Sequence, residues 1–75
     1  LDSTLVDGWL VLGRLAEVAD NDVTLAEQRF RRAMAAAPGD PRPYSRLAGL
    51  LARRGEGGEA VGLAERAVAL DPASP

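Results

Sequence analysis

The chain has 75 residues with neither cysteine nor histidine, which excludes disulfide bonds, Cys/His zinc sites and His-based catalytic triads. Its formal net charge is −2, and all nine basic residues are arginine, which with abundant alanine and glycine indicates a GC-rich coding background. No apolar run approaches the roughly 18 residues that span a bilayer, so we expect a soluble segment. The absent cysteines allow both a cytoplasmic and a periplasmic location.

The sequence repeats itself with a period typical of stacked helical units. A shift of 34 or 35 residues aligns two units, at about residues 6–40 and 41–74. The aligned pairs at an offset of 35 are Trp9 with Tyr44, Leu12 with Leu47 and Ala16 with Leu51; those at an offset of 34 are Ala26 with Ala60, Ala33 with Ala67, Met34 with Val68, and Pro38 with Pro72. The change of offset predicts one extra residue in the first turn, at Asp20, Asn21 and Asp22.

Apolar spacing of i, i+3, i+4 and i+7 predicts two amphipathic helices in each unit, near residues 4–19, 24–37, 41–54 and 57–70. The four predicted stripes are Trp9, Leu12, Gly13 and Ala16; Ala26, Phe30, Ala33 and Met34; Tyr44, Leu47, Ala48 and Leu51; and Ala60, Ala64, Ala67 and Val68. The fold class is therefore all-α, made of tandem antiparallel helical hairpins. We expect the alanines to allow close helix packing while Trp9, Phe30 and Tyr44 fill the spaces between helices.

Capping residues predict the helix boundaries. Thr24 and Glu27 have the spacing of a capping box, and Asp40 before Pro41 has the pattern of an N-cap followed by a preset first turn. Gly55 suits the left-handed conformation that ends a helix. Pro38 and Pro72 cannot continue a preceding helix.

These residues resemble the tetratricopeptide repeat pattern, W-x-x-L-G-x-x-Y followed by A-x-x-x-F-x-x-A and P over about 34 residues. The matching residues are Trp9, Leu12, Gly13, Ala26, Phe30, Ala33 and Pro38 in the first unit, and Tyr44, Leu47, Ala48, Gly55, Ala60, Ala64, Ala67 and Pro72 in the second. Ala16 and Ala64 depart from the pattern, since an aromatic residue is usual at both. The resemblance implies a right-handed α-solenoid segment that binds or scaffolds other proteins.

The chain carries two units, begins with Leu1 and ends with a Pro-Ala-Ser-Pro run that matches residues 38–41. We expect a fragment of a larger, bacterial repeat protein whose exposed end faces are covered by neighbouring repeats or by a second copy. The stretch from Gly8 to Arg14 is similar to segments of bacterial assembly factors, including the apocytochrome-handling subunit of c-type cytochrome maturation.

The resemblance also implies a site, because the first helix of each hairpin in this family lines a concave groove for a partner peptide. That role falls on Asp7, Leu10, Arg14, Glu17, Arg42, Ser45, Arg46, Gly49, Ala52 and Arg53. Arg42 and Arg46 are like charges one turn apart, which favours an anion such as a partner's carboxylate between them. The alternative is that both are solvated or paired with acids of a neighbouring helix.

Within the family, one subset holds chaperone C-termini through a carboxylate clamp that needs a lysine and an asparagine, where this chain has Leu10 and Arg14. We therefore disfavour chaperone-tail binding. Leu10 and Val11 instead suit a partner's apolar side chains.

Other kinds of function receive less support from the sequence. The run from Asp20 to Asp22 lacks the glycine and the distant glutamate of a calcium loop. The arginines of residues 29–32 and 42–54 would attract nucleic acid, but stacking aromatics are missing and the net charge is negative. No nucleophile and base occur together, so we expect no enzyme and no cofactor. The remaining alternative is a structural spacer or a self-association element without a peptide ligand.

Overall fold

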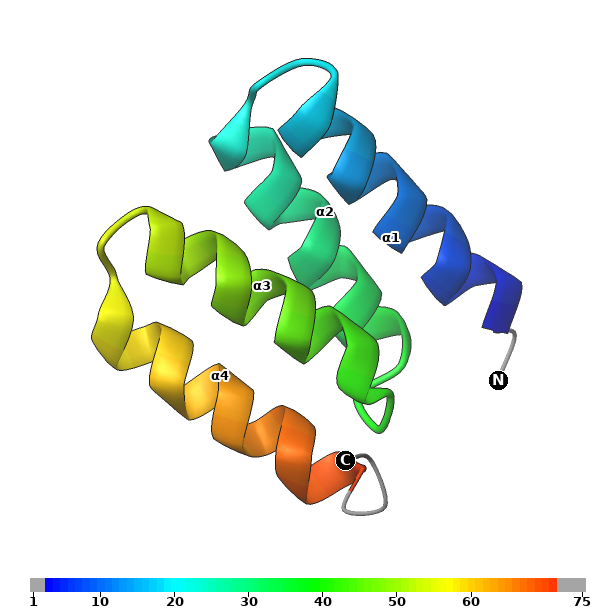
Figure 1. Ribbon diagram of the computed structural model, residues 1–75. Coiled ribbons are helices and arrows are strands. Elements are labelled where there is room, and N and C mark those ends of the chain that lie inside the picture. The colour runs from blue at the N-terminus through cyan, green and yellow to red at the C-terminus, as the bar shows by residue number, and fades with distance from the viewer. Residues whose placement is uncertain (1–2, 72–75) are drawn as a thin grey trace.

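The computed structural model describes residues 3–71, with side chains from residue 5 onwards, and all of its regular structure is helical. The four helices are α1 (Ser3–Val18), α2 (Val23–Ala36), α3 (Pro41–Arg53) and α4 (Gly57–Leu70), and Figure 1 shows them following one another across the molecule. Each boundary lies within one residue of its prediction. The all-α hairpin architecture is therefore confirmed for this part of the chain.

Both ends of α3 agree with the capping predictions. Asp40 is the N-cap, its Oδ1 accepts a hydrogen bond of 3.0 Å from the backbone N–H of Arg42, and Pro41 occupies the first turn. Gly55 has φ 84°, in the left-handed region that glycine adopts without a steric penalty. Residues 72–75, where we predicted a second proline stop, lie outside the described residues.

The predicted capping box at the start of α2 is wrong. The N-cap is Asp22, whose Oδ1 accepts a hydrogen bond of 3.0 Å from the backbone N–H of Leu25. Asn21, with φ 51°, turns the chain so that Asp22 reaches this position. Glu27 is drawn instead to Arg31 and Arg54, so it does not complete a box with Thr24.

The helices form two hairpins, α1 with α2 and α3 with α4, and α2 packs on α3 to join them. The molecule measures 33 × 30 × 20 Å, so its thinnest dimension holds about two layers of helix. One buried cluster joins all four helices through residues Ala16, Ala26, Phe30, Leu47, Leu50, Leu51 and Ala60. A second joins Val6 to Ala33 and Ala37, with Trp9 packed against it.

The two hairpins pack their helices together with residues of different sizes. In the first, Gly13 gives Phe30 its space: a Cβ added at Gly13 would lie 2.5 Å from Cε1 of the ring. In the second hairpin the aligned residues are Ala48 and Ala64. The glycine and phenylalanine are thus replaced by two alanines, and Ala64 stays exposed.

Three members of the predicted apolar stripes are exposed to solvent. Leu12 is 43% exposed, Val68 is 68% exposed, and Ala64 is also exposed. Each lies on a terminal helix, α1 or α4, which has a neighbouring helix of this chain on one side only (Figure 1). Periodicity identifies an apolar face correctly, but a face is buried only where another helix covers it.

Candidate functional site

A hollow of about 330 Å³ lies between the first helices of the two hairpins, and we call it the inner groove. It is lined by Asp7, Leu10, Val11 and Arg14 of α1 and by Arg42 and Arg46 of α3. Five of these six residues belong to the predicted contact set, and Val11 is the addition. The groove places apolar side chains from α1 between charged groups from both helices.

Arg42, predicted as half of the principal contact pair, is already occupied by acids of this chain. Its Nη2 donates to Asp40 Oδ2 at 2.7 Å, and its Nη1 donates to Asp7 Oδ1 at 2.7 Å. These hydrogen bonds raise the pKa of Arg42, and hydrogen bonding from Arg42 lowers the pKa of Asp40. The alternative weighed from the sequence, pairing with a neighbouring acid, thus describes Arg42.

The other predicted contact residues lie on the same helices but do not all meet. Glu17 and Arg53 form an ion pair between α1 and α3. Gly49 is exposed, and a Cβ there would meet nothing within 4 Å. Ser45 lines a different hollow, between α3 and α4. The structure therefore gathers Asp7, Leu10, Arg14, Arg42 and Arg46, and leaves the remainder spread along the two helices.

Two arginines of the inner groove differ from the others in their partners. Within residues 5–71, neither Arg14 nor Arg46 makes an ion pair, whereas Arg42 is paired with Asp7 and Asp40. Both side chains are exposed and both line the hollow. The groove consequently holds two guanidinium groups that are not paired with an acid of residues 5–71.

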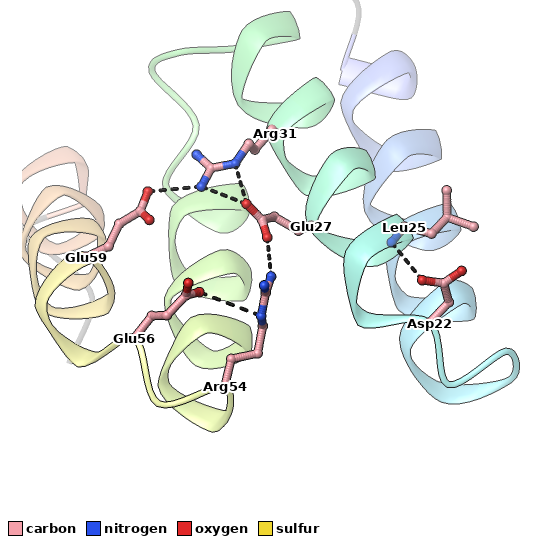
Figure 2. Close-up of polar contacts among 7 residues, drawn as sticks. All are labelled: Asp22, Leu25, Glu27, Arg31, Arg54, Glu56 and Glu59. Atoms are coloured by element: carbon pink, nitrogen blue, oxygen red, sulfur yellow. Dashed lines mark hydrogen bonds and ion pairs between the residues drawn. The ribbon is translucent and has the colours of Figure 1, made fainter.

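A separate cluster of charges, which the sequence analysis missed, joins α2 to α4 and to the turn between α3 and α4. Figure 2 shows Glu27 between Arg31 and Arg54, with Arg31 also reaching Glu59 at 2.9 Å. Hydrogen bonding from Arg31 is the main reason why the pKa of Glu27 is lowered. The i, i+4 spacing of Glu27 and Arg31 was a usable signal for half of this cluster. The sequence contains no comparable signal for the contacts with Arg54 and Glu59, which lie 27 and 28 residues from their partners.

The remaining arginines of α2 contact an aromatic ring. The guanidinium carbons of Arg29 and Arg32 each lie 5.6 Å from the centroid of the Trp9 ring, a distance at which a cation is attracted to the ring. With Arg31 paired to Glu27 and Glu59, the three arginines of α2 are each engaged within the chain. The arginines of residues 29–32 are thus divided among separate contacts in the fold.

The described residues offer neither a metal site nor a membrane span. Among residues 3–71, no three acidic side chains gather closely enough to hold a metal ion. The Asp20–Asp22 run serves as the turn before α2, where Asp22 caps the helix. No helix in that range has both the length and the apolar character needed to cross a bilayer.

Comparison with known proteins identifies the family. No curated protein is similar enough to the chain to count as a relative. A family model described as tetratricopeptide repeat matches residues 17–75, which include the end of α1 and all of α2, α3 and α4. Repeats of this kind generally mediate protein–protein interactions and are generally not catalytic. Since the match covers more than half of the chain and the described fold is two helical hairpins, the chain belongs to the tetratricopeptide repeat family.

Proposed function

We propose that this segment binds an extended peptide of a partner protein in the inner groove and has no catalytic role. The partner segment would carry a carboxylate for Arg14 and Arg46, next to apolar side chains for Leu10 and Val11. The observation that carries the proposal is the pairing pattern: Arg14 and Arg46 line one hollow and have no ion pair within residues 5–71. This moves the anion contact from the Arg42–Arg46 pair to the Arg14–Arg46 pair.

Arg42 has a different part in this proposal. Its position is held by Asp7 and Asp40, so it is a fixed wall of the groove and a poor contact for a further acid. An exposed ion pair is worth only about 0 to 1 kcal/mol. A partner's carboxylate that displaced Asp7 or Asp40 would exchange one such pair for another, so the exchange would add little binding free energy. Guanidinium groups without a partner can instead fork a carboxylate through two hydrogen bonds.

A second candidate function is a spacer or self-association element with an empty groove. It is favoured by the large apolar side chains that α1 and α4 expose, Leu15 at 52% and Val68 at 68% among them. That surface is separate from the inner groove, so the two functions can be tested independently.

The test selects peptides from a random phage-displayed library on the wild-type segment and measures the binding of the enriched sequences by fluorescence anisotropy. We expect the enriched peptides to contain aspartate or glutamate beside leucine-like residues. The variant Arg14→Glu with Arg46→Glu should bind them at least about tenfold more weakly, which corresponds to about 1.4 kcal/mol. Each substitution replaces attraction by repulsion, so the effect should fall as salt is added.

The matched control carries the same change of net charge outside the groove, as Arg29→Glu with Arg66→Glu. Neither residue lines the inner groove, so this variant should bind the peptides as the wild type does. Equal loss in both double variants would reduce the effect to net charge and refute the site. Enrichment of peptides without acids would refute the partner's chemistry.

A further inference from the structure

The two exposed ends of this segment correspond to two halves of an interface that the chain already contains. Inside the molecule, α3 packs on α2 through Leu47 and Leu50, which are 0% and 1% exposed and share a cluster with Phe30. With the offset of 35, these residues align with Leu12 and Leu15 of α1. In α1 the same positions are 43% and 52% exposed, because no helix of the described chain covers them.

The opposite end has the complementary hollow. A groove of about 590 Å³ lies between α3 and α4, and we call it the end groove. Ala48, Ala64, Ala67 and Val68 line its apolar part. They align with Gly13, Phe30, Ala33 and Met34 of the first hairpin, where Phe30 shares a buried cluster with Leu47 and Leu50 of α3 and Met34 packs against that cluster. The end groove is thus the second hairpin's version of the seat that α3 occupies in the first.

The sizes of these residues favour an added helix in the end groove. Where the first hairpin has Phe30 fully buried, the second has Ala64 exposed, so the space of an aromatic ring is left open. The exposed leucines of α1 are large apolar groups on a helix of the correct type. The α1 end of the segment therefore carries large apolar side chains, and the α4 end has the open space that such side chains could fill.

We propose that a second copy of this chain docks head to tail, with Leu12 and Leu15 of its α1 against α4 in the end groove of the first copy. Burying these side chains removes apolar surface from water, which favours association. The interface is heterologous, since it joins two different surfaces, and such contacts extend into open arrays when they do not close into a ring.

Charge at the rim of the end groove agrees with this arrangement. Asp7 of α1 and Arg42 of α3 form an ion pair 2.7 Å long within the chain, and they are aligned residues of the two units. In the stack, Arg42 of one copy takes the place of Asp7, and the second copy's Asp7 takes the place of Arg42. The rim of the end groove, which Arg42 lines, therefore meets an opposite charge and not a like charge, while Arg42 keeps Asp7 and Asp40 of its own chain as partners.

Three single variants test the proposal by sedimentation velocity and light scattering. Leu15→Glu disables the α1 face, and Val68→Glu disables the end groove; both side chains are exposed, so circular dichroism should show unchanged helix content. Val18→Glu is the matched control, an exposed valine on the same helix whose aligned residue Arg53 is exposed in α3; neither residue lines the inner groove or the end groove. The concentration series runs from roughly 10 μM to 1 mM, the range of weak, small interfaces.

The wild type and Val18→Glu should form assemblies larger than a dimer as the concentration rises, and each disabling variant alone should associate at least about tenfold more weakly. A mixture of Leu15→Glu with Val68→Glu should form a one-to-one dimer and nothing larger, because only one intact pair of surfaces remains. A wild type that stays monomeric throughout overturns the proposal. So does a Val68→Glu variant that dimerises while Leu15→Glu does not, since that pattern belongs to a symmetric contact between two α1 helices.

Arg46 lines both grooves, so the single variant Arg14→Glu, whose residue lines the inner groove and not the end groove, separates the two proposals. Loss of peptide binding in Arg14→Glu should leave the association series unchanged. Conversely, if the segment is monomeric and still binds the selected peptides, the inner-groove proposal stands and the proposal of a second copy in the end groove fails.

Discussion

Replacing Gly13 by alanine tests how closely α1 and α2 are packed. A Cβ at this position would lie 2.5 Å from Cε1, 2.7 Å from Cδ1 and 3.1 Å from Cζ of Phe30. Phe30 is 1% exposed within the largest buried cluster, so its ring has no empty space to enter. The alanine therefore forces either the ring or the helix axis to move.

Two effects of opposite sign determine the change in the free energy of unfolding. Overpacking a buried site costs about 1 to 3 kcal/mol, whereas alanine is favoured over glycine inside a helix by about 1 kcal/mol. Gly62→Ala isolates the second effect, because a Cβ at Gly62 would meet nothing within 4 Å. We expect Gly62→Ala to stabilise the fold and Gly13→Ala to lie about 1 to 3 kcal/mol below it.

Urea denaturation followed by far-ultraviolet circular dichroism, at one protein concentration, measures both variants. Phe30→Leu provides a further check, because a smaller side chain should accept the new methyl group. The penalty of Gly13→Ala should then shrink, and the coupling should appear in a double-mutant cycle. If Gly13→Ala stabilises as much as Gly62→Ala, the proposed contact between Gly13 and Phe30 is refuted.

Three other substitutions have defined outcomes. Asp22→Ala should lower the free energy of unfolding by about 0.5 to 2 kcal/mol and Thr24→Ala by much less, since Asp22 caps α2; urea titration would show the reverse order if a capping box formed. Hydrogen bonding from Arg31 lowers the folded-state pKa of Glu27 below 4.5, so its stabilisation is full above about pH 4.5 and is lost as the pH falls through the lowered pKa. Denaturation across that range should therefore show a shallower acid loss for Glu27→Gln, and an unchanged slope would count against the cluster. Tyr44→Phe should cost about 0.5 to 1.5 kcal/mol in thermal unfolding, because the hydroxyl donates to a backbone carbonyl at 2.9 Å; no change would mean that water replaces this bond.

Local features of the sequence predicted most of the fold. The i, i+3, i+4, i+7 spacing located all four helices, and Asp40 and Gly55 have the capping roles that their residue types indicate. These features act within one helical turn, so neighbouring residues are enough to identify them. The start of α2 was less certain locally, because Asp22 and Thr24 are both good N-cap residues and the Thr24–Glu27 spacing fitted by coincidence.

The candidate site depended on contacts that local patterns do not contain. Arg42 pairs with Asp7, which lies 35 residues earlier and meets it because α1 and α3 share the inner groove. The family resemblance implied a surface shared by the first helices of the two hairpins, but it could not show which arginines were already paired with acids of the chain. Likewise, the stripe containing Leu12 was correctly apolar, and its exposure depends on whether another helix lies beside α1.

The central claim is that a partner's acidic segment binds in the inner groove. Its most direct test is the two-dimensional nitrogen–proton NMR spectrum of the isotope-labelled chain, recorded as a selected acidic peptide is added. We predict that the largest shifts occur at Leu10, Val11, Arg14 and Arg46, and that they disappear for the same peptide with its carboxylates converted to amides. Shifts centred on the end groove, or on Leu12 and Leu15 of α1, would contradict the account. So would shifts that persist with the amide peptide.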